Sequence, residues 1–236
     1  MTVFTSVGIV ILAMLIMASL QLTPGIFLLF YHSALGKYSK SKASLLALFY
    51  FLGVEAITAF LLLSCFLLTN ACFLLSPCPE KSILAWIVVG VILSLTIVFF
   101  FFYFRNSKTT ALFISRNAAS KIQQTTANIK TNSDAFILGA SSTIYELFFT
   151  MPLYIIVSAE LMKFSTLNLT ADLLALLFIL MPITPLVIIY AKYQTGLNTA
   201  EIQKQRIKNI PFTKFIVCLS YLTIAILLIC FRINEL

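Results

Sequence analysis

The chain opens with an apolar run, residues 3–35, that is too long to form one straight membrane helix. About 20 helical residues cross the roughly 30 Å hydrocarbon core of a bilayer, so this run must be interrupted. The sequence Gln-Leu-Thr-Pro-Gly at residues 21–25 predicts where the break lies. Pro24 has no N–H to offer the Leu20 carbonyl, and Gly25 releases the backbone from helical dihedrals. Inside a membrane the freed carbonyl needs a protein or water partner, so the break is a candidate site.

A second interrupted segment, residues 135–161, begins the second half of the chain. It is again long and apolar, carries a central proline, Pro152, and also contains an acid, Glu146. Two interrupted segments that open two halves are typical of transporters built from structural repeats. The sequence therefore predicts a site between two broken helices.

The composition is that of an integral membrane protein. Hydrophobic residues make up 61% of the chain and charged residues only 10%, whereas soluble proteins average about 25% charged residues. The net charge of +8 does not indicate a nucleic-acid partner, because the bases lie in short segments that flank apolar spans. A length of 236 residues suffices for a single membrane domain, residues 1–236, within a lipid bilayer.

Hydropathy predicts an all-α protein, since each apolar stretch is long enough to cross and none shows the alternation of a β-barrel strand. Six spans are expected, at residues 3–35, 43–69, 83–103, 135–159, 173–191 and 215–231. Pro182 and Pro185 predict a kink in the fifth span. Residues 105–134 are expected to form a cytoplasmic linker, either an amphipathic surface helix or a solvated loop.

Most of the 16 Lys and Arg residues lie in the connections after the first, third and fifth spans. The last of these connections carries Lys192, Lys204, Arg206, Lys208 and Lys214. By the positive-inside rule these connections are cytoplasmic, which places both termini outside the cell membrane. Each half, residues 1–104 and 135–236, then contains three spans, and the halves form an inverted repeat with broken first and fourth helices.

Few polar residues lie inside the spans, and Glu146 is the strongest candidate for a functional role. A carboxylate at membrane depth is costly and usually faces the bundle interior or a cavity. Because burial disfavours charge and no Lys or Arg lies centrally in a predicted span, Glu146 is expected to bind a proton, a small cation or a substrate ammonium. Glu55, near the middle of the second span, is the next candidate.

The candidate substrate- or ion-binding residues are Glu146, Glu55, Gln21, Thr23, Pro24, Gly25, Ser142, Thr143, Thr150 and Pro152. Ser142, Thr143 and Thr150 share a helical stripe with Glu146 and are its expected partners, together with the freed carbonyls of Leu20 and Phe148. For Gln21 and Thr150 the alternative is that they only join helices by hydrogen bonds.

The five cysteines fall into two groups. Cys72 and Cys78 lie in a predicted outer loop and are able to form a disulfide if that side is oxidising. The others, Cys65, Cys218 and Cys230, lie inside spans and are interpreted as small apolar residues. The sequence contains no plausible metal-ligand spacing, glycine-rich phosphate loop or Ser-His pairing. No metal, cofactor or enzymatic activity is therefore predicted.

Residues 21–37, Gln-Leu-Thr-Pro-Gly-Ile-Phe-Leu-Leu-Phe-Tyr-His-Ser-Ala-Leu-Gly-Lys, resemble the Pro-Gly motif, apolar stretch and Gly-plus-base turn of LysE-type exporters. Ala-Phe-Ile-Leu-Gly at residues 135–139, followed by a proline-bearing span, is similar to the start of that superfamily's second half. The chain differs from the family pattern at Ile26, where a second proline is usual, and it lacks the Asn-Pro of the fourth span. The related CcdA and DsbD thiol carriers share the layout but need a cysteine in each broken helix, and this chain has none there.

These features together predict a secondary transporter that exports a small solute, either amino-acid-like or an ion, coupled through an intramembrane carboxylate. The alternative is a non-transporting membrane accessory or assembly subunit that uses the same scaffold to hold a partner. A homo-oligomer is compatible with either function.

Overall fold

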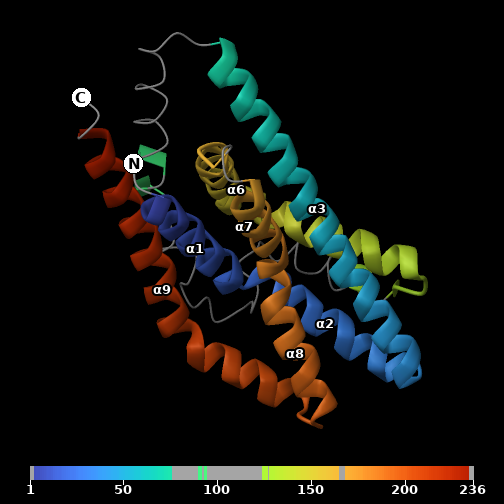
Figure 1. The fold of residues 1–236 in the computed structure, drawn as a ribbon. Helices are drawn as coiled ribbons and strands as arrows, with labels where there is room; N and C mark the ends of the chain where they lie inside the picture. Colours follow the sequence, from blue (N-terminus) through green and yellow to red (C-terminus); the bar gives the residue numbers. More distant parts are fainter. Residues whose placement is uncertain are drawn as a thin grey trace.

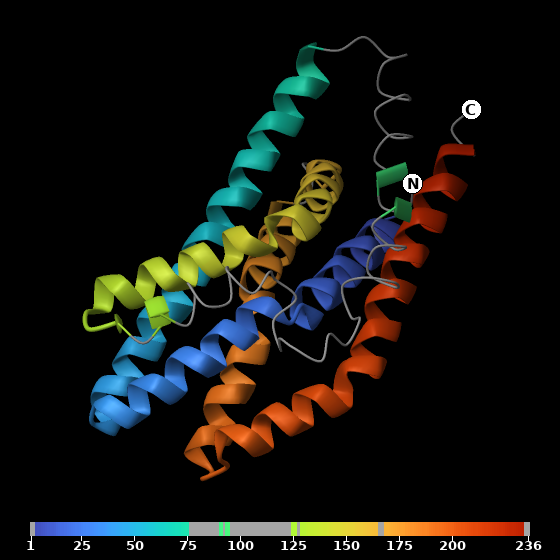
Figure 2. The same cartoon turned by 180° about the vertical axis from the view of Figure 1, so that it is seen from behind.

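The computed structural model describes residues 3–75, 90–91, 93–94, 124–126, 128–164 and 168–233. Within these ranges the fold is helical and contains no strand. The elements are α1 (Val3–Ser19), α2 (Leu22–Lys37), α3 (Lys40–Leu75), α6 (Asn132–Met162), α7 (Asn168–Leu180), the 3-10 turn η2 (Met181–Ile183), α8 (Thr184–Gln194) and α9 (Thr199–Ile233). They form an elongated bundle with α3 and α9 on opposite sides (Figures 1 and 2).

Four described stretches are helical, long and apolar enough to cross a membrane: Phe4–Lys37, Lys40–Ala71, Leu169–Gln194 and Thr199–Cys230. A fifth, Asn132–Leu147 with Phe149–Met162, meets the same criteria as a pair of helices bent by 86°. These helices indicate an integral membrane protein. Most of the predicted third span, residues 83–103, and most of the predicted linker, residues 105–134, lie outside the described residues.

The first interruption lies slightly earlier than the sequence predicted. It consists of Leu20 and Gln21, between the end of α1 and the start of α2, whereas Pro24 and Gly25 belong to the first turns of α2. Pro24 fits there because the N–H groups of a first helical turn have no intrahelical partner, so the N–H group that proline lacks costs little stability. The Gly25 N–H donates to the Gln21 carbonyl at 3.0 Å and closes the first turn.

The predicted interruption of the second half is a sharp bend in α6. The two straight parts of this helix meet at Phe148 with an angle of 86°. Pro152 lies inside the helix and has no N–H for the Phe148 carbonyl, which accounts for a bend at this position. Beside the bend, the Tyr221 hydroxyl of α9 donates to the Phe149 carbonyl at 2.9 Å.

Prolines also interrupt the segment between α7 and α8. Pro182 lies in the 3-10 turn η2, and Pro185 lies in the first turn of α8. Neither proline can donate to a preceding carbonyl, so the α-helical ladder gives way to a short 3-10 turn. A short 3-10 turn therefore occupies the position at which the sequence predicted a kink.

The last helix is longer than predicted, and its basic segment is not a loop. α9 begins at Thr199 and contains Pro211, so four of the bases expected in a connection lie on the helix itself: Lys204, Arg206, Lys208 and Lys214. The early start of α9 is explained by two reciprocal hydrogen bonds that cap the beginning of the helix. The Glu201 N–H donates to Asn198 Oδ1 at 2.9 Å, and the Asn198 N–H donates to Glu201 Oε2 at 3.2 Å.

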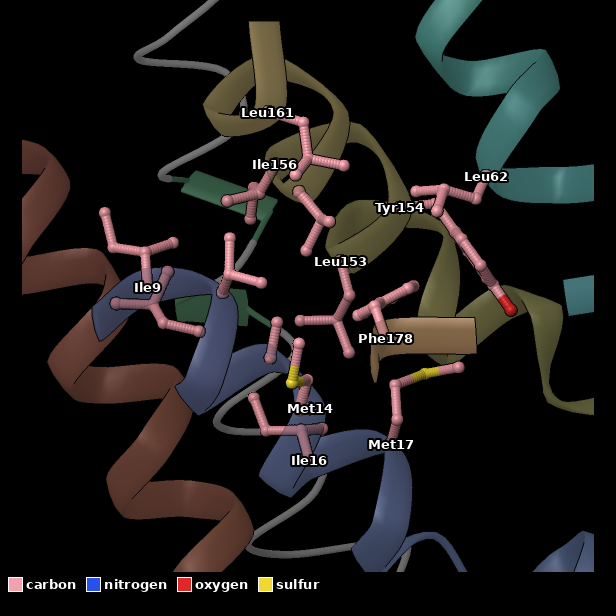
Figure 3. Close-up of a cluster of buried hydrophobic side chains, with 14 of the residues drawn as sticks. Ile9, Met14, Ile16, Met17, Leu62, Leu153, Tyr154, Ile156, Leu161 and Phe178 are labelled. Atoms are coloured by element: carbon pink, nitrogen blue, oxygen red, sulfur yellow. The ribbon is translucent and has the colours of Figure 1, made fainter. Parts of the chain in front are cut away.

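Buried apolar side chains form two separate clusters. The first, here the α1 core, joins α1, the part of α6 after the bend, α7 and α9 with the middle of α3. Figure 3 shows part of it, with side chains of α1, α6 and α7 directed toward one another. The second, the α2 core, joins α2, the start of α3, the part of α6 before the bend, α8 and the start of α9. On α6, Leu138 belongs to the α2 core and Leu153 to the α1 core, so Glu146 lies between the two.

Two glycines bring α3 and α6 into backbone contact. A Cβ atom at Gly139 of α6 would overlap the Tyr50 carbonyl of α3, and one at Gly53 of α3 would overlap the Phe136 carbonyl of α6. Small residues permit such close approach between membrane helices. The crossing fixes the stripe of α6 that carries Gly139 and Glu146 against α3.

The basic turns share one end of the bundle. The turn between α2 and α3, which carries Lys37 and Lys40, and the turn between α8 and α9, next to Lys192, lie at the same end (Figures 1 and 2). The start of α1 and the end of α9 lie toward the other end. The connections after the first and fifth predicted spans are therefore together, as expected from their charge.

Candidate functional site

The two interrupted segments meet at Glu146, which is only 6% exposed. Its Oε1 atom accepts the N–H of Leu22 at 2.8 Å and the N–H of Thr23 at 3.1 Å. Its Oε2 atom accepts the Thr23 hydroxyl at 2.9 Å. A carboxylate just before the bend of α6 therefore binds the beginning of α2, just after the break in the first span. This contact between Glu146 and residues 21–23 is here called the junction.

Glu146 supplies a cap that α2 does not provide for itself. The first N–H groups of a helix have no intrahelical partner, and the N-cap residue Gln21 makes no side-chain cap bond. The helix dipole adds partial positive charge at the same place, so a carboxylate is favoured there. The neighbouring donors are two N–H groups and a hydroxyl, a set that fits an ionised carboxylate.

Binding of a proton to Glu146 requires only one of these bonds to change. The Thr23 hydroxyl is able to reverse and accept a hydrogen bond from the protonated acid, while the N–H donors of Leu22 and Thr23 remain. The bonds would then be neutral and weaker than charge-assisted ones. The strength of the contact between α6 and α2 therefore depends on whether the Glu146 carboxylate is ionised or has bound a proton.

Tyr50 joins α3 to both interrupted segments. Its buried hydroxyl lies 3.1 Å from the Thr23 carbonyl oxygen and 2.9 Å from Ser142 Oγ. Ser142 in turn donates its hydroxyl to the Gly139 carbonyl at 2.7 Å. The sequence prediction missed Tyr50. One signal for it was available, because Tyr50 carries a hydroxyl within an apolar span, where polar groups are rare.

Arg206 reaches the break from α9. Its Nη2 atom donates to the Gln21 carbonyl oxygen at 2.8 Å and lies 3.3 Å from Gln21 Oε1. The guanidinium also attracts the Glu146 carboxylate electrostatically. The sequence analysis found no Lys or Arg centrally in a predicted span and assigned Arg206 to a connection, whereas the structure places Arg206 on the helix α9. Ile202 and Ile210 flank it at four-residue spacing, a pattern that indicates a face directed inward.

Other predicted partners of Glu146 bind elsewhere. The Thr143 hydroxyl donates to the Gly139 carbonyl at 3.3 Å, and the Thr150 hydroxyl donates to the Glu146 carbonyl at 3.2 Å. Both hydroxyls thus satisfy the backbone of α6, which is a common use of threonine in apolar helices. The prediction that they contact the carboxylate is corrected, whereas Thr23 and Gln21 do lie at the junction.

Glu55 is not part of the junction. It lies on α3 five residues beyond Tyr50, is half-buried, and forms no hydrogen bond or ion pair with the residues that the structure describes. A five-residue offset on a helix turns the side chain to a different face from that of Tyr50. The two acids singled out in the sequence therefore have different surroundings.

The cysteines and the single histidine add no metal site within the described part of the chain. No group of three His, Cys, Asp or Glu residues is close enough there to hold an ion. Cys65, Cys218 and Cys230 form no disulfide among the described residues. His32 Nδ1 lies 2.6 Å from the Thr199 hydroxyl at the start of α9. The side chains of the predicted disulfide pair, Cys72 and Cys78, lie outside the described residues.

No protein-family model, curated protein or solved structure matches this chain.

Replacing Tyr50 by phenylalanine is expected to lower the thermal midpoint of the detergent-purified protein. The variant keeps the ring and loses hydrogen bonds to α2 and α6, which corresponds to about 1 kcal/mol and a shift of about 2–4 °C. Differential scanning fluorimetry measures it. Tyr190→Phe is the control, because the Tyr190 hydroxyl bonds Ser44 at 3.0 Å at a half-buried position away from the junction. A larger shift for Tyr190→Phe than for Tyr50→Phe would contradict the assignment.

Proposed function

We propose that this chain is a multi-pass secondary transporter that exports a small solute, and that Glu146 couples export to a proton or cation gradient. The proposal is supported by one observation above all. The two interrupted segments meet at a single buried carboxylate, and this acid bonds the backbone of the opposite segment. Ionisable groups inside membrane bundles typically belong to ion or substrate pathways.

The coupling follows from the bonds that Glu146 makes. With the carboxylate ionised, three donors at the start of α2 hold that helix against α6. Binding of a proton or cation removes charge from this contact and weakens it. A ligand shifts an equilibrium between two arrangements only if it binds them differently, and loading of Glu146 provides that difference. Loaded and unloaded carriers would then favour different orientations of the two segments.

The substrate class and topology are further parts of the proposal. An amino-acid-like solute is favoured by the resemblance of residues 21–37 to LysE-type exporters, and a small ion is the other candidate. We place both termini outside the cell membrane, with the halves as inverted repeats, because the basic turns gather at one end. Each interrupted segment then contributes one side of the site.

The proposal is tested with purified protein in liposomes that contain a trapped pH-sensitive dye or, in parallel, a trapped sodium-sensitive dye. A panel of amino acids and small cations is added under an imposed proton or sodium gradient. We expect the wild type to give a solute-dependent signal and Glu146→Gln to give none, while remaining folded. Glutamine retains an oxygen for the N–H groups of Leu22 and Thr23 and an amide for the Thr23 hydroxyl, but it does not titrate.

Glu55→Gln is the matched control, because it removes the same charge from a half-buried position on the adjacent helix. We expect it to retain gradient-dependent flux. A normal gradient response in Glu146→Gln would remove Glu146 from the mechanism. If only Glu55→Gln lost that response, the coupling role would pass to Glu55.

A second candidate function is a membrane accessory subunit that does not transport. It is favoured by the completeness of the contact, because both oxygens of Glu146 are bonded within the chain. In that case the junction is a static joint, and a partner binds elsewhere on the bundle. Absence of flux for every solute, together with copurification of a stoichiometric membrane partner from native cells, would favour this function over transport.

A further inference from the structure

The segment of α9 before Pro211 has two different faces. It lies at an angle to the rest of the helix along the end of the bundle (Figure 2). Its inner face contacts the protein through Ile202, which is 1% exposed and belongs to the α2 core, and through Arg206, which bonds Gln21. This segment, residues 199–210, is here called the arm.

The outer face of the arm is basic. Lys204 and Lys208 are exposed and lie one helical turn apart. Lys192 of α8 reaches the same corner, where its Nζ atom donates to Gln205 Oε1 at 2.6 Å. The nearby acid Glu201 is turned to the helix start by its bond with the Asn198 N–H. Positive charge therefore exceeds negative charge at this corner.

The same stripe of α9 becomes aromatic beyond Pro211. Phe212 is 68% exposed and Phe215 is 63% exposed, and both follow Lys204 and Lys208 at helical spacing. Exposed bases followed by exposed aromatic rings are typical of a helix that passes from the lipid headgroup layer into the acyl chains.

We propose that the outer face of the arm binds anionic phospholipid headgroups, with Lys204 and Lys208 on the phosphate and Phe212 and Phe215 among the acyl chains. Charge complementarity selects this partner, because the leaflet that faces basic segments carries anionic lipid. The bound lipid holds the arm in place, and the inner face of the arm holds Gln21 through Arg206. Lipid charge thereby stabilises the break between α1 and α2.

The test uses fluorescence quenching by brominated lipids, which does not depend on transport. Trp86, the single tryptophan of the chain, is replaced by phenylalanine, and Phe212→Trp places a fluorophore beside the two lysines. The protein is reconstituted with brominated phosphatidylglycerol or brominated phosphatidylcholine. We expect preferential quenching by the anionic lipid, and a loss of that preference of about fivefold for each lysine replaced in Lys204→Gln and Lys208→Gln.

The control is the double variant Lys40→Gln and Lys130→Gln, which removes the same charge from other elements. We expect it to leave the preference at Phe212→Trp unchanged. Equal quenching by the two lipids in the parent protein would overturn the proposal. An equal loss in the control variant would also overturn it, because the attraction would then be diffuse and not a property of the arm.

Discussion

Replacing Glu146 by alanine is expected to lower the stability of the folded protein by roughly 3 kcal/mol, because charge-assisted hydrogen bonds contribute about 1.5–3 kcal/mol each and buried unpaired donors add a penalty. The change leaves the N–H groups of Leu22 and Thr23 without the acceptor that caps α2. The measurement is the denaturation midpoint in a fixed detergent, followed by helical circular dichroism. Hydrogen exchange at residues 20–25 locates the loss.

Glu146→Gln is the matched comparison and is expected to lose much less. Its amide oxygen accepts the same N–H groups, and its amide nitrogen donates to the Thr23 hydroxyl. Equal stability of the alanine variant and the wild type would show that Glu146 does not hold the junction. Equal losses for alanine and glutamine would show that charge matters and hydrogen bonding does not.

Replacing Gly139 by alanine is expected to separate α3 from α6 and to destabilise the protein by about 2 kcal/mol or more, in the range of overpacked interiors. The added methyl group overlaps the Tyr50 carbonyl, and backbone cannot rotate away as a side chain can. Gly→Ala in a helix otherwise gains up to about 1 kcal/mol, so net destabilisation would mean that the steric overlap dominates. The same denaturation assay applies.

Gly8→Ala on α1 supplies the control for helix propensity. Apart from the backbone of its own helix, no atom of the described residues lies within 4 Å of a Cβ atom placed at Gly8, so the substitution is expected to be neutral or stabilising. Gly53→Ala should behave like Gly139→Ala, since its methyl group overlaps the Phe136 carbonyl. If Gly139→Ala and Gly8→Ala had the same effect, the close crossing of α3 and α6 would be refuted.

The sequence predicted the class of the fold and the two interrupted segments because these depend on local properties. Apolar length indicates a membrane span, and a proline within it indicates an interruption. The exact position of the first break was wrong by a few residues. Proline is compatible with a position just before a helix or in its first turn. In the structure α2 begins ahead of Pro24, where Glu146, more than a hundred residues away in sequence, accepts the first N–H groups of the helix.

The site was predicted in part for the same reason. Glu146, Thr23 and Gln21 could be singled out because polar groups are rare within apolar spans. The contacts of Tyr50 and Arg206 depend on how three helices pack, and no local pattern specifies that packing. Arg206 in particular was assigned to a loop, since a basic segment that ends at Pro211 has the composition of a connection.

The division of the interior into an α1 core and an α2 core determines where the bundle is able to shear. Within each cluster the contacts are apolar and numerous, so sliding inside a cluster would open voids. Between the two cores, at the level of Glu146, the contacts are a few hydrogen bonds. A water molecule or a polar solute can replace hydrogen bonds of this kind. α3, α6 and α9 each contribute side chains to both clusters, so any displacement along this plane must bend or turn these three helices.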